Sequence, residues 1–447
     1  MEYAALKNTG VWETLSVVGK RCYLPPGIIF WSARGREEAE INATLGTARG
    51  LEKEIIQGGR DVTVPFYLPC LRNFFQELEP DEIFAYAPLA GLPKFRAAWR
   101  EWTLYKLSSH REKLASLMSQ PVVVPGISSA LFVAARLFLD QAEKFVTTDL
   151  RWVNVDNIFC RNIGAEIVPF ALFDGVKFNT EGMKEALFST SEQGKKVVLL
   201  LNLPNNPAGF LPSESDAQEI KKALVEVAEE AGKWVVVLLD DAYEGYVYEE
   251  GILRNSLFGM LTGAHPRLLV VKLDGVSKEL LFYGGRVGAV TFGLPEGLQE
   301  EIIPDIRSEL EAKVAAISRS TFSSAPRVVQ ELAARVLEAR EDFLQERRAV
   351  IEVLKERYRI LKEALQELKS PLIRPLPFNS GFFAFLHLQG IRASDFAEHL
   401  ITKYKVGVIP WEGPGVNGIR IAFCAVQPGK LPKVVECIKK TADDLTP

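Results

Sequence analysis

Between about residues 120 and 295, short apolar runs alternate with stretches of helical spacing. The runs are PVVVP, KFVTTD, AEIVPF, KKVVLLLN, WVVVLLD, RLLVVKLD and RVGAVTFG. Such nearly continuous Val and Leu indicate strands buried on both faces of a mostly parallel sheet. One connecting stretch, residues 213–232, begins with a possible capping box of Ser213 and Asp216 and ends at Gly232, which predicts a helix. The pattern predicts an α/β domain whose sheet lies between helices.

The pattern changes after about residue 325. Residues 327–368 form a long charged amphipathic stretch, which we interpret as a solvated helix that links two domains. The strand-like runs FFAFLHL, VGVIP and GIRIAF follow, with the helix-like SDFAEHLITKY between the first two. They predict a smaller α+β domain, and the first 60 or so residues, which show no βαβ signal, are expected to join it. The expected division is an N-terminal segment 1–60, a large domain 61–326 and a C-terminal part 327–447 of the small domain.

Composition and charge narrow the class of protein. The chain has 447 residues, 47% hydrophobic and 25% charged, which is typical of a globular protein. A net charge of -4 argues against nucleic-acid binding, which normally requires a basic surface. Five cysteines without a CxxC pair favour reduced thiols and a cytoplasmic protein. The N-terminus has no apolar core of signal-peptide type, the longest apolar stretch is broken by Pro125 and Arg136, and the four histidines are far apart, so neither a membrane span nor a metal site is expected.

Polar side chains follow four of the predicted strands. Asn206 follows KKVVLLLN, WVVVLLD ends in Asp240 with Tyr243 three residues on, RLLVVKLD precedes Lys278, and PVVVP precedes Ser128. Ligands of open α/β sheets lie outside the carboxyl ends of the strands, so these residues are expected at one rim. Each alone is explained by a turn, a helix cap or the surface. Their combination favours a shared site.

The residue types at this rim suit one particular ligand. A buried ammonium such as that of Lys278 is costly unless it is paired or consumed in a bond. A lysine, a carboxylate, an amide, a phenol and a helix start can together hold pyridoxal 5′-phosphate, a pyridine aldehyde that carries a phosphate. Lys278 would form a Schiff base with the aldehyde and Asp240 would keep the ring nitrogen protonated. The helix start and Arg286, in GGRVG, would hold the phosphate.

Five segments, in collinear order over roughly residues 40–425, resemble the fold-type I aminotransferases of class I/II, the aspartate aminotransferase-like family. They are YAPLAGLPKFR, NNPAG, DDAY, the segment from Ser277–Lys278 to GGRVG, and GIRIAF. The resemblance implies a large domain with a mostly parallel seven-stranded sheet between helices and a smaller α+β domain from both chain ends. It also implies pyridoxal 5′-phosphate and a homodimer with shared active sites.

The resemblance also implies roles around the cofactor. Asp240 would pair with the ring nitrogen, while Tyr243 and Asn206 would bond the ring oxygen. The remaining expected contacts are Trp152 on the ring face and, at the phosphate, the Ile127 backbone, Ser128, Arg286 and Tyr86 of the partner subunit. Gly275 stands where the family commonly has a serine and Ala208 where it has the threonine of NPTG, which implies a somewhat different phosphate site.

The substrate residues are less sharply indicated. Arg420, in GIRIAF, would pair with the substrate α-carboxylate through its guanidinium fork, and Asn206 and Gly46 would lie close to the substrate. Arg319 lies in a segment that resembles the source of a side-chain-carboxylate arginine in aspartate-specific members. Arg319 as an ordinary helix-end residue and Gly46 as a turn glycine are equally open. An aromatic pocket is open too, with the candidates Phe74, Phe75, Phe322 and Trp411.

The predicted activity is transamination between an L-amino acid, of aspartate/glutamate or aromatic type, and a 2-oxo acid such as 2-oxoglutarate. It would run by a ping-pong mechanism through the Lys278 Schiff base, with the freed amine as general base. The alternative is a C–S lyase or another elimination or decarboxylation enzyme on the same cofactor. A regulator is disfavoured because the N-terminal stretch is short and not basic, and a nucleotide-binding protein because GxGxxG and GxxxxGK[ST] are missing.

Overall fold

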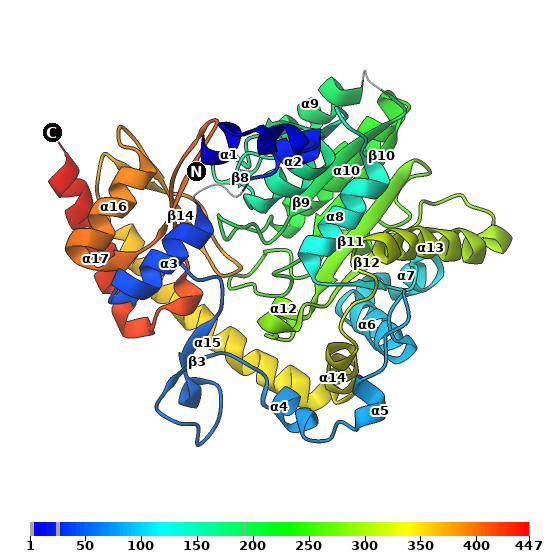
Figure 1. The fold of residues 1–447 in the computed structure, drawn as a ribbon, viewed down its shortest axis with the longest axis horizontal. Helices are drawn as coiled ribbons and strands as arrows, with labels where there is room; N and C mark the ends of the chain where they lie inside the picture. The colour runs from blue at the N-terminus through cyan, green and yellow to red at the C-terminus, as the bar shows by residue number, and fades with distance from the viewer. Residues whose placement is uncertain (1–3, 24–26, 192–193, 447) are drawn as a thin grey trace.

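The computed structural model describes residues 4–23, 27–191 and 194–446. Its largest sheet has seven strands in the order β4-β12-β11-β10-β9-β5-β6 (Figure 1). The strands are β4 (Val122–Val124), β5 (Lys144–Thr148), β6 (Glu166–Phe170), β9 (Lys196–Asn202), β10 (Trp234–Asp240), β11 (Leu268–Gly275) and β12 (Gly288–Gly293). All pairings are parallel except those of β12, which runs antiparallel to β11 and β4. The predicted mostly parallel seven-stranded sheet is confirmed, one strand for each apolar run.

Helices cover both faces of this sheet. Val235, Val237 and Leu239 of β10 belong to the apolar cluster that includes α10 (Glu214–Glu230), whereas Val236 and Leu238 belong to the cluster that includes α8 (Ile127–Phe138). Two-sided burial explains why the strands are apolar throughout rather than alternating. Further helices flank the sheet on either side, α9 (Thr180–Ser191) against β5 and β9, and α13 (Ile303–Thr321) against α8.

The predicted capping box is present at the start of α10. The Ser213 side chain accepts a hydrogen bond from Asp216 N at 3.0 Å, and the Asp216 carboxylate accepts one from Ser213 N at 3.1 Å. Two amide groups that the helix cannot satisfy are thereby bonded.

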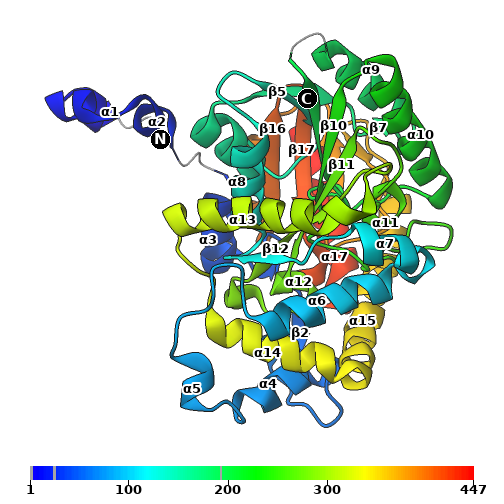
Figure 2. The ribbon, with the colours of Figure 1, turned by 90° about the vertical axis from the view of Figure 1, so that its right-hand side faces the viewer.

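A four-stranded antiparallel sheet, in the order β13-β14-β17-β16, forms the core of a second unit. Its strands are β13 (Ile373–Pro375), β14 (Ala384–Leu388), β16 (Ile409–Gly413) and β17 (Val416–Ile421), and it is accompanied by α16 (Ala393–Tyr404) and α17 (Leu431–Leu445). Strand β1 (Ile41–Asn42) pairs in parallel with β15 (Val406–Gly407), and α3 (Ile28–Glu38) contacts β15. Helix α2 (Val17–Arg21) lies away from this unit, since it contacts the π-helical segment η4 (Asp156–Ile163) on the side of the large sheet (Figure 2).

The remaining elements are mostly short. The helices are α1 (Ala4–Lys7), α4 (Pro69–Phe75), α5 (Pro80–Ile83), α6 (Pro93–Lys106), α7 (Arg111–Leu117), α11 (Phe258–Leu261) and α12 (Val276–Glu279). The 3-10 turns are η1 (Gly10–Thr14), η2 (Glu52–Glu54), η3 (Ser108–His110), η5 (Tyr283–Gly285), η6 (Glu300–Ile302), η7 (Phe423–Ala425) and η8 (Pro428–Lys430). Two small hairpins are formed by β2 (Arg49–Leu51) with β3 (Thr63–Pro65), and β7 (Phe173–Asp174) with β8 (Lys177–Phe178). None of the described helices combines the length and apolar character that a membrane span requires.

The charged stretch 327–368 differs from its interpretation as one solvated helix. It forms α14 (Arg327–Glu338) and α15 (Arg340–Gln366), and α14 packs on α6 and α4. Eight of the twelve residues of α14 are buried, Val329, Leu332, Ala333 and Val336 among them. The stretch is therefore not solvated throughout: its apolar residues pack into the core, and the charged residues Glu331, Arg347 and Arg357 are buried too. Helix α15 runs between the two units (Figure 1).

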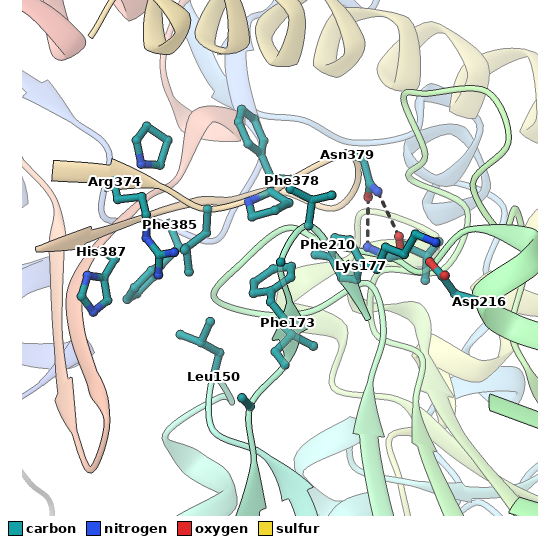
Figure 3. Close-up of a pocket in the computed structure, with 18 of the residues that line it drawn as sticks. Leu150, Phe173, Lys177, Phe210, Asp216, Arg374, Phe378, Asn379, Phe385 and His387 are labelled. Atoms are coloured by element: carbon teal, nitrogen blue, oxygen red, sulfur yellow. Dashed lines mark hydrogen bonds between the residues drawn. The ribbon is translucent and has the colours of Figure 1, made fainter. Parts of the chain in front are cut away.

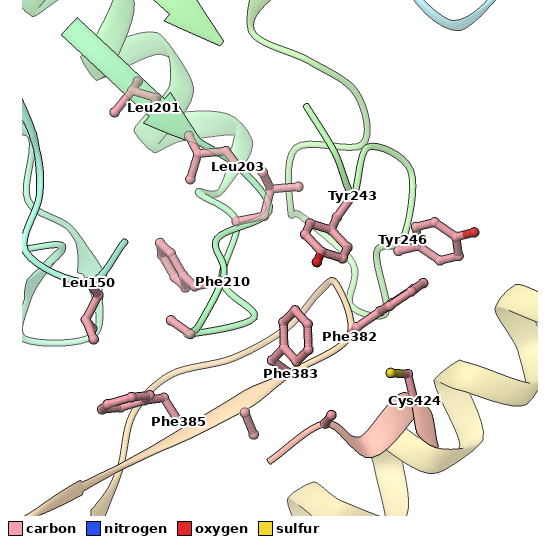
Figure 4. Close-up of a cluster of buried hydrophobic side chains, with 14 of the residues drawn as sticks. Leu150, Leu201, Leu203, Phe210, Tyr243, Tyr246, Phe382, Phe383, Phe385 and Cys424 are labelled. Atoms are coloured by element: carbon pink, nitrogen blue, oxygen red, sulfur yellow. The ribbon is translucent and has the colours of Figure 1, made fainter. Parts of the chain in front are cut away.

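An aromatic cluster joins the two units. The Tyr243 ring lies edge-on to those of Phe382 and Phe383, with centroids 5.2 and 5.5 Å apart, and the Tyr246 ring lies 4.8 Å from that of Phe382 (Figure 4). Edge-to-face pairs of this kind add to the stability gained from burial. The cluster places the loop after β10 against the segment before β14, and so fixes the position of Tyr243.

Candidate active site

Lys278 lies on α12, the short helix that follows β11. Its side chain is half-buried, and Nζ lies 5.2 Å from the centroid of the Tyr243 ring. Tyr246 donates a hydrogen bond to the Lys278 carbonyl at 2.7 Å, which anchors the backbone. Burial lowers the pKa of the amine, Asp240 opposes this shift, and Arg286 adds to it. The structure thus favours the neutral, nucleophilic form of Lys278 more than water would.

A cavity of about 290 Å³ surrounds Lys278 at the carboxyl ends of the strands. Ten of the twelve predicted site residues line it: Gly46, Ile127, Ser128, Trp152, Asn206, Asp240, Tyr243, Lys278, Arg286 and Arg420. They come from both units and from segments as far apart as Gly46 and Arg420. The tertiary structure therefore gathers these residues around one ligand-sized space.

Asp240 ends β10 and is 3% exposed. Its carboxylate accepts a hydrogen bond from Ala242 N at 3.2 Å. Burial raises the pKa of Asp240 to about 6, against the opposing effect of Lys278. Burial thus makes ionisation of Asp240 less favourable than in water. A cationic group bound beside Asp240 would lower this pKa again and stabilise the ionised carboxylate.

One end of the cavity forms a cradle for an anion. Ile127 and Ser128 begin α8, where N–H groups are free of helical partners, and Arg286 faces this turn. A Cβ placed on Gly126 would lie 2.3 Å from Arg286 Nη2, so the guanidinium rests directly against the glycine backbone. A Cβ on Gly275 would lie 2.6 Å from the Val287 carbonyl oxygen, which explains why a serine has no room there.

Arg420 projects from β17 and is 2% exposed. Nη1 donates to Asn206 Oδ1 at 3.0 Å and Nη2 to the Thr44 carbonyl at 2.9 Å, while the guanidinium lies 4.2 Å from the centroid of the Phe383 ring. Nε is buried and has no hydrogen-bond partner within the described part of the chain. Burial lowers the pKa of Arg420 to about 10. A buried guanidinium that lacks a carboxylate partner is costly, and an anionic ligand would offset that cost.

Two predicted residues lie outside this cavity. Tyr86 is 93% exposed, ahead of α6, and its expected role was in the partner subunit. Arg319 is exposed near the end of α13, where it donates to Ser323 Oγ at 2.8 Å. The aromatic candidates Phe74, Phe75, Phe322 and Trp411 do not line the cavity either, although Trp411 lies 5.8 Å from the Arg420 guanidinium.

Several lining residues were missed from the sequence. Asn202, whose side chain accepts a hydrogen bond from Asn206 N at 2.8 Å, ends β9 and was detectable by the same strand-end argument. Tyr283 and Phe383 had no local signal. Phe383 lines the cavity because the second unit packs against the first, and Tyr283 because the chain turns back after α12. The other missed lining residues are Ile28, Thr47, Ala242 and Ser277.

The lysine, the buried carboxylate and the arginine-lined cradle around one cavity define the class of pyridoxal phosphate enzymes. The family model for aminotransferases of class I and II matches residues 64–438. The chain belongs to this family, so it is an aminotransferase whose cofactor is pyridoxal 5′-phosphate.

Curated relatives are distant but cover most of the chain. An aspartate aminotransferase of Pyrococcus abyssi and aromatic-amino-acid aminotransferase 2 of Thermococcus litoralis are each 23% identical over 86% of this chain and 91% of their own. Among solved structures, an aminotransferase from Anaerococcus prevotii has a TM-score of 0.80 at 24% identity, over 95% of this chain and 98% of that one. The structural match confirms the fold.

Proposed function

We propose that this aminotransferase moves the amino group of an L-amino acid to a 2-oxo acid at the cavity around Lys278. The observation that carries the proposal is that Lys278 and Asp240 line the same cavity as Arg286 and Arg420. One amine, one carboxylate and two guanidinium groups match the aldehyde, ring nitrogen and phosphate of the cofactor and the carboxylate of an amino acid.

The residues present fit pyridoxal phosphate at each of its polar groups. Lys278 would hold the aldehyde carbon covalently and Asp240 the ring nitrogen. The α8 start and Arg286 would bind the phosphate, in the cradle that a side chain at position 126 would fill. The remaining contacts would be Tyr243 and Asn206 at the ring oxygen and Trp152 at the ring face. When bound, the cofactor supplies an electron sink that stabilises negative charge at the substrate α-carbon.

The protein's own groups would orient the substrate and move its proton. Arg420, aimed by Asn206 and the Thr44 carbonyl, would hold the α-carboxylate. The Lys278 amine, with a pKa lowered by burial, would accept the α-proton at Nζ and return it, as a general base and then a general acid. The two half-reactions would use the same site in turn, which gives ping-pong kinetics.

The lining of the cavity favours an aromatic or apolar side chain in the amino acid. The basic residues among its lining residues are Lys278, Arg286 and Arg420, each already assigned to another group. Phe383, Tyr283 and Ile28 supply apolar surface instead. Aspartate or glutamate would need a further cation, which Arg319 does not provide within its own chain. Aromatic amino acids are therefore the proposed donors, with an aromatic 2-oxo acid as the acceptor, because 2-oxoglutarate would need the same further cation as glutamate.

A homodimer and a cytoplasmic location complete the proposal. Arg286 is exposed in the single chain, and Tyr86 is almost fully exposed, so a partner could cover the phosphate end of the cavity. Tyr86 of the partner subunit would then reach the phosphate. Sedimentation of the purified enzyme tests the dimer, and a monomeric active enzyme would refute it.

The five cysteines are all free in the structure, which suits a reducing compartment and so the proposed cytoplasmic location.

Absorption spectra of the purified, cofactor-loaded enzyme test the reaction. The visible cofactor band should disappear with an aromatic amino acid and return with the corresponding aromatic 2-oxo acid. Loss of the band with aspartate or glutamate alone would refute the aromatic preference. Release of pyruvate and ammonia from cysteine conjugates, with no need for a 2-oxo acid, would instead identify a lyase.

A further inference from the structure

A second, larger cavity of about 800 Å³ lies between the two units (Figure 3). One wall comes from Leu150, the hairpin β7–β8, the loop at Phe210 and the start of α10. The opposite wall comes from α15, the segment 374–379 and β14. This outer cleft shares no lining residue with the catalytic cavity. Its volume is that of sites for small organic ligands.

The middle of the outer cleft is aromatic. Phe173, Phe210 and Phe378 lie at its centre, with Phe385 towards the second unit (Figure 3). The rings of Phe173 and Phe210 meet edge-to-face, with centroids 4.8 Å apart. An aromatic ring placed here would gain both burial and edge-to-face contacts.

The acids around the outer cleft already have partners. Asp149 accepts hydrogen bonds from Leu150 N at 2.6 Å and Leu172 N at 2.9 Å. Asp216 caps α10, and Glu249 pairs with Lys362. Two of these carboxylates are thus held by backbone N–H groups, and Glu249 is held by an ion pair.

Two cationic side chains of the outer cleft, by contrast, are available to a ligand. Arg374 and Lys177 are both exposed, project from opposite walls, and form no ion pair within the described ranges (Figure 3). Arg374 lies directly across the β13–β14 ladder from His387, whose Nδ1 is buried without a partner among the described residues. The cleft therefore offers a guanidinium and an imidazole side by side, next to aromatic surface.

We propose that the outer cleft is a second binding site, specific for aromatic carboxylates. Arg374 would pair with the carboxylate, His387 would add a hydrogen bond, and the ring would lie among Phe173, Phe210 and Phe378. A ligand there would bridge both units.

The outer cleft is also connected to the catalytic cavity through shared chain segments. Three short segments supply one residue to each cavity: 150–152, 206–210 and 383–385. A ligand held in the outer cleft would constrain the same segments that carry Trp152, Asn206 and Phe383.

Calorimetric titration of the cofactor-loaded enzyme with hydrocinnamate tests the site. This aromatic carboxylate lacks amino and oxo groups and is no substrate. We expect Arg374→Gln to weaken binding roughly tenfold or more, because a charge-assisted hydrogen bond is lost. Arg348→Gln, at an exposed arginine of α15 outside the cleft, should leave affinity unchanged.

A third variant separates the outer cleft from the catalytic cavity. Hydrocinnamate can also occupy the catalytic cavity through its carboxylate at Arg420, so two sites per chain are expected in the wild-type enzyme. Arg420→Gln should retain the site that Arg374→Gln weakens, since Arg420 does not line the outer cleft. Binding that disappears in Arg420→Gln but persists in Arg374→Gln would place the ligand in the catalytic cavity and overturn the proposal. No measurable heat with the wild-type enzyme, or equal affinity of wild type and Arg374→Gln, would overturn it as well. Arg374 is exposed, so its replacement should not prevent folding.

Discussion

Two lysines six residues apart show how differently one side chain can be used. Lys272 lies in the middle of β11 and is completely buried, and Lys278 lies just beyond the end of the same strand. Burial opposes the charge of both. Lys272 contacts three carboxylates, which hold its pKa well above the usual value, whereas the pKa of Lys278 is lowered.

Lys272 belongs to a buried network of ion pairs. Its Nζ pairs with Asp241, with Glu244 at 2.8 Å and with Asp274 at 3.6 Å. Lys106 extends the network from Glu244, at 2.5 Å, to Glu279, at 3.2 Å. Such a group is stable only as a whole, since any member that lost its partners would be a buried unpaired charge.

Two members of this network are sequence neighbours of the catalytic residues. Asp241 directly follows Asp240, and Glu279 directly follows Lys278. Asp240 and Lys278, which line the cavity, are thus each followed by a member of the buried network. Charged groups that pair within the protein thus stabilise the structure beneath the cavity, whereas charged groups that face the cavity remain available to bind cofactor and substrate.

Removal of Lys278 should have the largest effect on activity. Lys278→Ala should lower turnover by at least about 10²- to 10⁴-fold, because the proton-transfer group is lost. Its unfolding free energy should change little, since Lys278 forms no ion pair within residues 4–23, 27–191 and 194–446. Steady-state kinetics and denaturant unfolding measure the two effects. Normal turnover in this variant would refute the assigned role.

Removal of Lys272 should reverse that outcome and act on stability. Lys272→Met leaves Asp241, Glu244 and Asp274 without their shared cation, which should cost about 3–5 kcal/mol of unfolding free energy. Lys369→Met, at an exposed lysine that forms no ion pair with the residues the structure describes, is the matched control. If both variants unfold at the same guanidinium concentration, the network does not support the fold as described.

Arg420→Gln tests a ligand-directed charge outside the network. The value of kcat/KM for amino acids should fall roughly 10- to 100-fold, because a charge-assisted pair with the carboxylate is lost. Amines without a carboxylate should react equally well with both enzymes. Equal losses for the two kinds of substrate would contradict the carboxylate role.

The smallest expected effect is on how the unfolding free energy of the cofactor-free enzyme depends on pH. The pKa of Asp240 rises from 3.8 to about 6 on folding, so the native state binds a proton more tightly than the unfolded state between these values. Its contribution to stability is therefore greatest below pH 3.8 and is lost as the pH rises to about 6. Over this window wild type should lose about 1 kcal/mol per pH unit relative to Asp240→Asn. Parallel stability curves for the two proteins would show that Asp240 has an ordinary pKa.

The sequence predicts the large sheet well and the helices around it less well. Each of the seven apolar runs became a strand, because two-sided burial leaves a continuous pattern that is hard to mistake. The burial of the stretch 327–368 was harder to predict, since its many charged residues suggest a solvated helix although most of α14 is buried. Lys278, Asp240 and Asn206 were predictable because they follow strands, and Arg420 through a family motif. The contribution of Phe383 depends on how two units pack, which no local pattern encodes.

The positions of the strands along the chain and the residue types at their ends can be predicted from the sequence alone, because apolar periodicity and strand termini are local properties of the chain. Long-range packing determines that Lys272 is paired with carboxylates and that Lys278 faces a cavity. It also decided that Arg420 meets Asn206 across the two units and that a second cleft opens beside Phe210. These outcomes depend on contacts between residues tens to hundreds of positions apart, and burial sets their energies by removing the water that would otherwise stabilise each charge.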